Sequence, residues 1–369
     1  MRLPLRPDLE PVEAYGAPQL DVSVRLNVNE NPYQPSAGLI ADITGAVAEA
    51  VRGANRYPDR DFTKLSAALA HYLERESGVR PPAVWAGNGS NEVMLQLLQA
   101  YGGVADGIAR VVVSATPTYS MYPEYARDTQ CEYVTVPRRT DFSVDIAALL
   151  ETVRDRQASV VILASPNNPT GTMLPQDDLR QLLAASTDSA PNGAATLVVV
   201  DEAYGEFRRT GVPSALELLA DNPHLVVCRT MSKAFGMAGL RLGYAALHPE
   251  VRRDLERVRL PYHLSALTQA AALAALRHAD EQLAQISQLR HRRNDLVVWL
   301  RAQGLTAVDS DANFVLFGVF ADRRRIFSEL LEHGVLIRQV GPAGYLRVSV
   351  GSETEDAAFR KALREVMEN

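Results

Sequence analysis

The stretch LVVCRTMSKAFGMAGLRLGYAAL, from Leu225 to Leu247, holds two short apolar runs separated by a turn that carries Lys233. The runs, Leu225–Cys228 and Tyr244–Leu247, have the length and composition of buried β-strands. Lysine and arginine together number 38, yet lysine occurs only at Lys64, Lys233 and Lys361. Because arginine stays protonated whereas lysine can lose its proton, a lysine kept in this turn indicates amine chemistry.

Five more apolar runs of strand length precede this stretch, and segments of helical length separate several of them. The runs are Ala83–Ala86, Arg110–Ser114, Glu132–Val136, Ser159–Ala164 and Thr196–Val200. Short apolar strands joined by helices predict an α/β fold, with a mostly parallel seven-stranded sheet between helices. In such sheets, ligands bind beyond the carboxyl ends of the strands.

The rest of the chain predicts two further parts. Residues 1–38 are rich in proline and asparagine and poorly periodic, which predicts an extended arm. Helical spacing predicts helices over Gly38–Arg52, from Phe62 to about Glu76, and twice within Ser265–Ala302. Strands are predicted near Phe314–Phe317, Leu336–Arg338 and Tyr345–Val350. We therefore divide the chain into the arm (1–38), a large α/β domain (39–262) and a smaller α+β domain (263–369).

Composition excludes several function classes. The 369-residue chain has a net charge of −6, which argues against nucleic acid as a partner. No apolar run approaches the ~20 residues of a membrane span, and the first ten residues lack the apolar core of a signal peptide. Cys131 and Cys228 lie in apolar runs, so we expect reduced thiols, no metal site and a cytoplasmic protein.

Polar residues follow one of the early strands. The segment Gly87–Glu92 (GNGSNE) opens a predicted helix with an apolar face of Val93, Leu97 and Leu98. Ser90 or Asn91 can cap that helix, and free amides at its start can bind phosphate. A dinucleotide site would need a third glycine where Glu92 or Val93 stands, so we reject that interpretation.

Two more polar segments end predicted strands. In Ser165–Gly171 (SPNNPTG) the Asn168 amide can donate to a ring oxygen, although such segments are also common turns. Asp201–Tyr204 (DEAY) follows four apolar residues, and a carboxylate there can hold a pyridine nitrogen protonated or can simply cap a helix. A lysine near these groups fits a Schiff base with pyridoxal 5'-phosphate (PLP).

The order and spacing of these motifs resemble the fold type I PLP-dependent aminotransferases. The motifs are the phosphate-binding turn, Asn-Pro-Thr-Gly, the strand-end aspartate with tyrosine three residues later, and Ser-Lys with arginine eight residues after the lysine. More segments are similar to the histidinol-phosphate aminotransferases: Asn27–Pro32, Arg56–Asp59, Pro117–Tyr122, Ala312–Phe314 and Leu346–Val348. Leu5–Leu9 and Tyr15–Gln19 are similar to the actinobacterial branch, and the similarity covers nearly the whole chain.

The resemblance implies a transaminase of L-histidine biosynthesis that converts L-histidinol phosphate and 2-oxoglutarate to imidazole acetol phosphate and L-glutamate. It implies that Lys233 binds PLP and moves the substrate proton, and that Asp201 pairs with the pyridine nitrogen. The other implied cofactor contacts are Ser90, Asn91, Tyr119, Asn168, Tyr204, Ser232, Arg241 and, from a partner subunit, Tyr57. The implied substrate contacts are Tyr15, Asn29, Arg338 and Arg347, and an arginine fork suits both phosphate and carboxylate.

Other activities share the same cofactor residues. An aromatic aminotransferase would differ only in its substrate pocket, and an amino-acid phosphate decarboxylase also resembles this family. A non-catalytic PLP-binding regulator would need a helix-turn-helix, for which there is no room before Asn27. Gln339 stands where the resemblance predicts an acidic residue after Arg338. We expect a homodimer that binds small molecules and neither nucleic acid nor membrane, with the arm packed on the small domain and the partner subunit.

Overall fold

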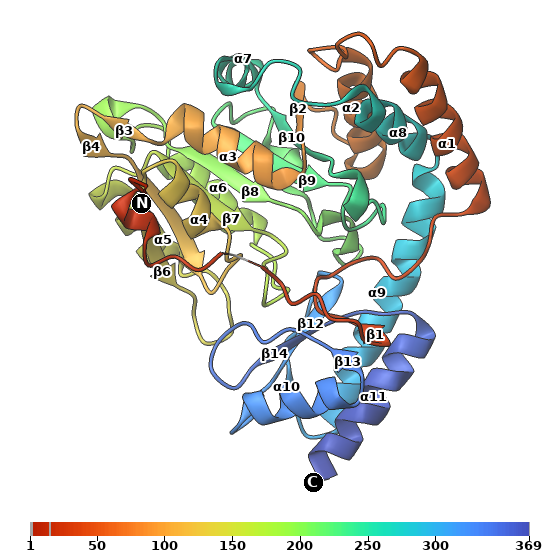
Figure 1. Ribbon diagram of the computed structural model, residues 1–369. Coiled ribbons are helices and arrows are strands. Elements are labelled where there is room, and N and C mark those ends of the chain that lie inside the picture. Colours follow the sequence, from red (N-terminus) through yellow and green to blue (C-terminus); the bar gives the residue numbers. More distant parts are fainter. Residues whose placement is uncertain (1–2, 15, 369) are drawn as a thin grey trace.

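The computed structural model describes residues 3–14 and 16–368, and its largest sheet, of seven strands, lies in the larger part of the molecule (Figure 1). In spatial order the strands are β2 (Ala83–Gly87), β10 (Gly243–Leu247), β9 (Leu225–Thr230), β8 (Leu197–Asp201), β7 (Val160–Ala164), β5 (Val111–Thr116) and β6 (Glu132–Pro137). β10 is antiparallel to β2 and β9, whereas the other neighbouring pairs are parallel. The predicted α/β class is confirmed, and all seven predicted strands match to within two residues at each end.

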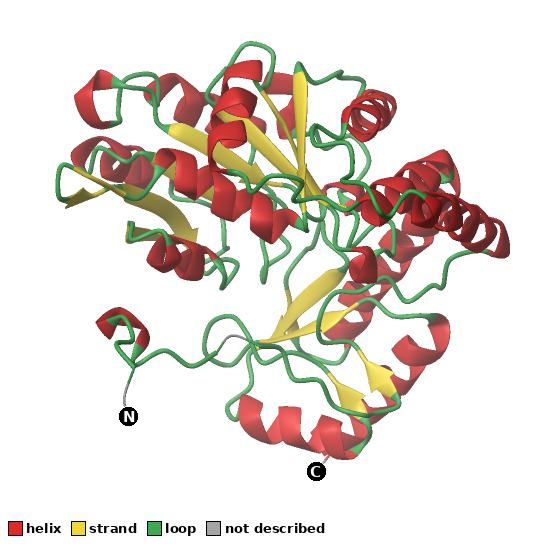
Figure 2. Cartoon of the chain, turned by 45° about the horizontal axis from the view of Figure 1, so that its top comes forward, coloured by secondary structure: helices red, strands yellow, loops and turns green. Residues whose placement is uncertain are grey.

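Helices lie on both sides of this sheet, as Figure 2 shows. They are α2 (Thr63–Ser77), α3 (Ser90–Tyr101), α4 (Tyr122–Asp128), α5 (Ile146–Asp155), α6 (Gln176–Ala185) and α7 (Pro249–Val258). Every residue of β7, β8 and β9 is buried, because strands covered on two faces have no side for water. The valine and leucine runs that predicted these strands therefore form the main core.

A second core lies under a smaller antiparallel sheet of β11 (Thr306–Ala307), β12 (Phe314–Gly318) and β14 (Leu346–Ser349). Helices α10 (Arg323–Glu332) and α11 (Glu353–Glu368) accompany it. Helix α9 (Ala279–Ala302) joins the two cores, because Ile286 and Leu289 belong to the first and Leu296 and Leu300 to the second. The two helices predicted within Ser265–Ala302 are confirmed as α8 (Ala266–Arg277) and α9.

The N-terminal arm is tied to the smaller sheet region through strand β1 (Val24–Arg25), which pairs in parallel with β13 (Val335–Leu336). The strand predicted over Leu336–Arg338 ends at Leu336 instead. Beyond it the chain leaves β1 and crosses to β14, where Arg338 makes an isolated bridge with Arg347. The predicted strand is therefore divided, because Leu336 pairs with β1 whereas Arg338 bridges to β14.

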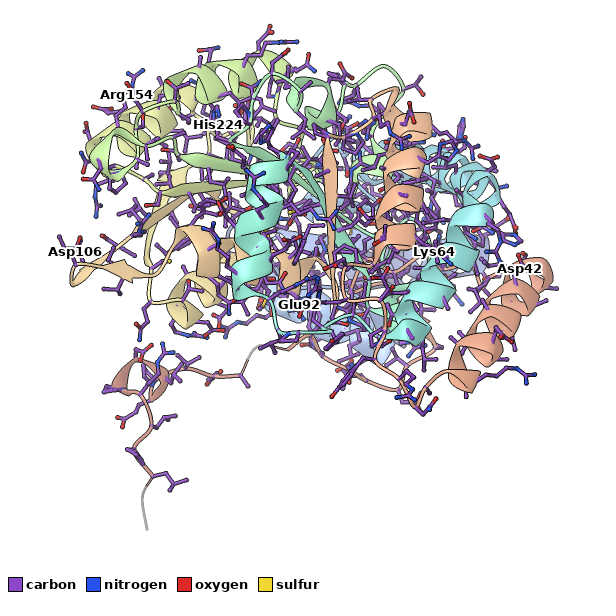
Figure 3. All side chains as sticks on the ribbon, turned by 90° about the horizontal axis from the view of Figure 1, so that it is seen from above. Asp42, Lys64, Glu92, Asp106, Arg154 and His224 are labelled. Carbon is purple, nitrogen blue, oxygen red and sulfur yellow. The ribbon has the colours of Figure 1, made fainter. Side chains whose placement is uncertain are left out.

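The remaining elements lie at the periphery. Helix α1 (Ala37–Arg52) matches its prediction and packs mainly on α8. A hairpin of β3 (Val104–Ala105) and β4 (Ile108–Ala109) projects from the body, with Asp106 at its tip (Figure 3). Short 3-10 helices span Pro7–Leu9, Pro191–Gly193, Gly205–Phe207, Ala215–Leu218 and Ala238–Leu240. Within residues 3–14 and 16–368, no helix is long and apolar enough to cross a membrane.

Candidate active site

A cavity of about 630 Å³ opens at the carboxyl ends of the large sheet's strands and is closed on its other side by the arm and the smaller sheet. Most of the site residues predicted from the sequence line this cavity. The predicted residues that line it are Asn29, Ser90, Asn91, Tyr119, Asn168, Asp201, Tyr204, Ser232, Lys233, Arg241, Arg338 and Arg347. Their convergence follows from the topology, since parallel strands end at a common edge.

Lys233 follows strand β9 and reaches into this cavity. Its Nζ donates a hydrogen bond to the Val28 carbonyl oxygen at 2.8 Å and lies 6.0 Å from the centre of the Tyr204 ring. Burial lowers the pKa of Lys233 to about 8, and the positive charges of Arg347 and Arg241 act in the same direction. Lys64 and Lys361 are exposed on helices. Lys233 is therefore the lysine whose amine can lose its proton near neutral pH.

Asp201 is the last residue of β8, and it is 7% exposed. Its Oδ2 accepts a hydrogen bond from the Tyr122 hydroxyl at 2.8 Å, and its Oδ1 accepts one from the Ala203 N–H at 3.1 Å. Burial raises the pKa of Asp201 to about 6, against these two hydrogen bonds, which lower it. A carboxylate held this way is available to a cation or a protonated ring nitrogen in the cavity.

Tyr122 is a site residue that the sequence analysis missed. The segment Pro117–Tyr122 was recognised, but Tyr119 was selected from it. Tyr119 lines the cavity, and its ring meets that of Tyr122 edge to face, with 5.6 Å between the ring centres. The position of Tyr122 in a recognised segment was the only signal, because its contact with Asp201 joins residues 79 positions apart.

One end of the cavity is built to hold an anion. Helix α3 begins at this end of the cavity with Ser90. The Arg241 side chain lies at the same end, and its Nη1 donates a hydrogen bond to the Ser232 Oγ at 3.3 Å. Gly89 precedes the helix with φ of 85°, and a Cβ on it would lie 2.5 Å from the Arg241 Nη2. Only glycine lets the guanidinium approach this closely. Free amides of the first helical turn and the guanidinium therefore face one spot.

The prediction that Ser90 or Asn91 caps this helix is wrong. Gly89 occupies the capping position, and no side chain there accepts a hydrogen bond from the helix. Ser90 and Asn91 already belong to the first turn, so their side chains are beyond the position from which a cap acts. Both line the cavity instead.

At the opposite end, Arg347 on β14 is 5% exposed. Its Nη1 donates to the Asn168 Oδ1 at 2.5 Å and its Nη2 to the Asn27 carbonyl oxygen at 2.7 Å. The guanidinium also lies over the Phe314 ring, 5.1 Å from its centre. Arg338 lines the same end, and its backbone exchanges hydrogen bonds with that of Arg347. Two guanidinium groups therefore face one part of the cavity.

Asn29 connects the arm to the cavity. Its Nδ2 donates to the Tyr204 hydroxyl at 2.9 Å, and its backbone N–H donates to the Ser349 Oγ at 2.9 Å. The backbone of Asn29 is left-handed, with φ of 58°, a conformation that asparagine tolerates better than most residues. The side chain is thereby placed beside Tyr204 within a site formed by three separate parts of the chain.

Of the predicted residues, Tyr57 does not line this cavity. Tyr57 is 79% exposed and stacks on Tyr262, with 4.4 Å between the ring centres. Tyr15 lies outside the described residues. Among residues 3–14 and 16–368, no cluster of three or more histidine, cysteine, aspartate or glutamate side chains is placed to hold a metal ion.

Comparisons with known proteins agree with this geometry. The family model of aminotransferase class I and II matches residues 22–366. The histidinol-phosphate aminotransferase 3 of Burkholderia lata is 57% identical over 99% of this chain and 96% of its own length. The histidinol-phosphate aminotransferase of Thermobifida fusca is 55% identical over 98% of this chain and 95% of its own.

Among solved structures, histidinol-phosphate aminotransferase from Sinorhizobium meliloti in complex with pyridoxal-5'-phosphate aligns with a TM-score of 0.81. It is 27% identical, and the alignment covers 94% of this chain and 91% of that one. The resemblance recognised in the sequence motifs is thereby confirmed.

Proposed function

The chain belongs to the class I and II aminotransferase family, and from this premise we propose that it transfers the amino group of L-histidinol phosphate to 2-oxoglutarate. The products are imidazole acetol phosphate and L-glutamate, in L-histidine biosynthesis. The observation that carries this proposal is the single cavity in which Lys233, Asp201 and Arg347 meet. The relatives that are 55–57% identical over nearly their full length carry the name of this reaction.

The residues present fit PLP. We assign its phosphate to the end of the cavity where Gly89 leaves room for Arg241, with Ser90, Asn91 and Ser232 beside it. Asp201 would pair with the ring nitrogen, and Tyr119 would lie against the ring face. Tyr204 and the amide group of Asn168 face the ring hydroxyl, since the Asn168 oxygen already accepts from Arg347. Each polar part of the cofactor thus has a partner of complementary charge or hydrogen-bonding character.

PLP supplies an electron sink for the pair of electrons left when the substrate α-carbon loses its proton. The side chains around it move and hold protons. The Lys233 Nζ, whose pKa is lowered to about 8, would take the proton from the substrate α-carbon and deliver it to the C4′ carbon of the cofactor. Asp201 is ionised at neutral pH because its pKa is about 6, and it would therefore keep the ring nitrogen protonated. The positive charge of that nitrogen would in turn lower the pKa of Asp201 further.

Arg347 and Arg338 hold the anionic end of either substrate. A guanidinium fork matches both the phosphate of L-histidinol phosphate and a carboxylate of glutamate, so one site can serve the two half-reactions. The ring of Phe314 supports the Arg347 guanidinium from one side, which fixes the plane in which the fork can bind.

We infer that the protein works as a cytoplasmic homodimer in which two chains share each active site. Tyr57 is exposed on its own chain, and in the dimer we expect its hydroxyl to reach the PLP phosphate of the partner subunit. A symmetric two-fold interface would place both tyrosines equivalently. The free thiols of Cys131 and Cys228 suit a reducing compartment.

A substrate panel tests the proposed reaction. The purified protein with PLP is supplied with 2-oxoglutarate and, in separate assays, with histidinol phosphate, phenylalanine, tyrosine or threonine phosphate. We expect the highest kcat/KM with histidinol phosphate. Faster turnover of phenylalanine would assign the protein to the aromatic aminotransferases, and release of carbon dioxide from threonine phosphate would assign it to the decarboxylases.

A further inference from the structure

A buried ion cluster centred on Arg229 lies beside the strand ends that carry Asp201 and Lys233. Arg229 belongs to β9 and has no exposed surface. Its Nη2 lies 2.7 Å from the Glu202 Oε2 and 3.3 Å from the Glu76 Oε2, and its Nη1 lies 3.0 Å from the Glu206 Oε1. A Cβ on Gly205 would lie 2.7 Å from the Arg229 Cζ, so the guanidinium occupies space that a glycine leaves open.

Glu202 connects this cluster to the proposed cofactor site, because it directly follows Asp201 in the chain. Its carboxylate also accepts hydrogen bonds from the Ser214 Oγ and the Ala215 N–H, both at 2.7 Å, so its position is held from several sides. Burial opposes its ionisation, but the nearby charges of Arg229 and Arg208 bring the pKa of Glu202 below its usual value. Glu202 is therefore a carboxylate, fully buried, one residue from Asp201.

The charge of Glu202 acts on Asp201. After burial, which is the main cause, the negative charge of Glu202 contributes to the raised pKa of Asp201. The other ionisable groups that face Asp201 are Tyr122 from α4 and Cys228 from β9, and burial raises the pKa of both well above the working range. Lys233 lines the same cavity. Glu202 is thus the neighbouring anion, and Arg229, which pairs with it at 2.7 Å, is the cation that balances it most, with Arg208 acting in the same direction.

We propose that Arg229 is a positioning residue that keeps Asp201 ionised and in place beside Lys233. It does so by neutralising Glu202 and by tying the end of β8 to β9, the strand that leads to Lys233. The inference rests on the proposed function, because it takes Asp201 as the partner of the PLP ring nitrogen. Without Arg229, the buried Glu202 carboxylate would lose its direct ion-pair partner, and its negative charge would favour the protonated form of Asp201.

The test uses the holoenzyme loaded with PLP that carries 15N in its ring, since the chemical shift of that nitrogen reports whether it is protonated. In Arg229→Gln we expect a smaller protonated fraction than in the wild type. We also expect the dissociation constant for PLP to rise about tenfold or more, the equivalent of one pKa unit. The double variant Arg229→Gln with Glu202→Gln removes both charges, and it should return both measurements toward the wild type.

A matched control separates positioning from ordinary destabilisation. Arg293 is another arginine with almost no exposed surface, and its Nη1 donates to the carbonyl oxygens of Phe207 and Ala312 at 2.7 and 3.2 Å. Arg293→Gln should lower the unfolding temperature and leave the nitrogen signal unchanged. An unchanged signal and unchanged PLP affinity in Arg229→Gln would overturn the inference, as would a double variant no better than the single one.

If Arg229→Gln does not fold, Glu202→Gln alone decides the question. It leaves the positive charge of Arg229 near Asp201, so the ring nitrogen should keep its proton to a higher pH than in the wild type. An unchanged titration midpoint would overturn the inference. Asp201→Asn distinguishes failure of this inference from failure of the proposed function. If this variant leaves the ring nitrogen protonated, Asp201 is not the partner of that nitrogen, and the proposed role of Asp201 fails together with that of Arg229.

Discussion

Replacing Arg347 with alanine should damage both half-reactions to a similar extent. Arg347 is almost fully buried, and two of its nitrogens are held by the Asn168 side chain and the Asn27 carbonyl, so the guanidinium is preorganised. In the proposed function the same fork binds the phosphate of one substrate and a carboxylate of the other. Its removal therefore takes a binding group away from both.

The size of the loss follows from the bonds removed. A hydrogen bond to a charged group contributes about 1.5–3 kcal/mol, so a two-pronged fork contributes about 3–6 kcal/mol. If these bonds are lost in the transition state, kcat/KM falls roughly 10²- to 10⁴-fold. A second effect concerns Lys233. Burial is the main reason for its pKa of about 8, but Arg347 contributes, so in the variant the Nζ should keep its proton to higher pH.

The assay follows each half-reaction separately by absorbance, with histidinol phosphate alone or glutamate alone added to the holoenzyme. Arg323→Ala is the control for a structural defect in the same part of the chain, because the Arg323 Nη1 donates to the Pro342 carbonyl oxygen at 2.9 Å. It should retain most activity. A loss confined to one substrate, or below tenfold for both, would refute the idea of a shared arginine fork.

Four further predictions concern the cofactor side of the site. Borohydride reduction of the holoenzyme should attach the cofactor covalently to Lys233, which peptide mass spectrometry detects. The variant Lys233→Ala should retain only trace turnover, and turnover at the wild-type rate would contradict the assignment of Lys233 as the PLP-binding lysine. Asp201→Asn should slow the reaction roughly 10³-fold or more, equivalent to about 4 kcal/mol, and a loss below tenfold would indicate a structural role. In the wild type, PLP affinity of the apoprotein should fall as pH drops through about 6, because protonation then removes the charge of Asp201. Mixed dimers of Tyr57→Ala and Lys233→Ala chains should regain the activity of about one working site per dimer. One of their two sites holds an intact Lys233 together with an intact Tyr57 from the partner subunit. If proven heterodimers recover no activity, Tyr57 serves the site of its own subunit.

The sequence by itself determined the features that depend on local pattern. Each strand of the large sheet is a short run of apolar residues, and a strand covered on both faces requires such a run wherever it lies in the fold. The scarcity of lysine singled out Lys233, and the spacing from Asp201 to Tyr204 and from Lys233 to Arg241 identified the family. The division at residues 38 and 262 stays a prediction.

Only the tertiary structure decided which side chains meet and how their charges behave. Arg347 bonds the Asn27 carbonyl across 320 positions, and Tyr122 bonds Asp201 across 79, so no local window contains either pair. The cap of α3 was mispredicted because Ser90 and Asn91 are residue types that favour a cap, whereas the folded chain places Gly89 at the capping position and Ser90 and Asn91 in the cavity wall. The pKa values of Lys233 and Asp201 depend on burial, which the folded packing of distant segments creates.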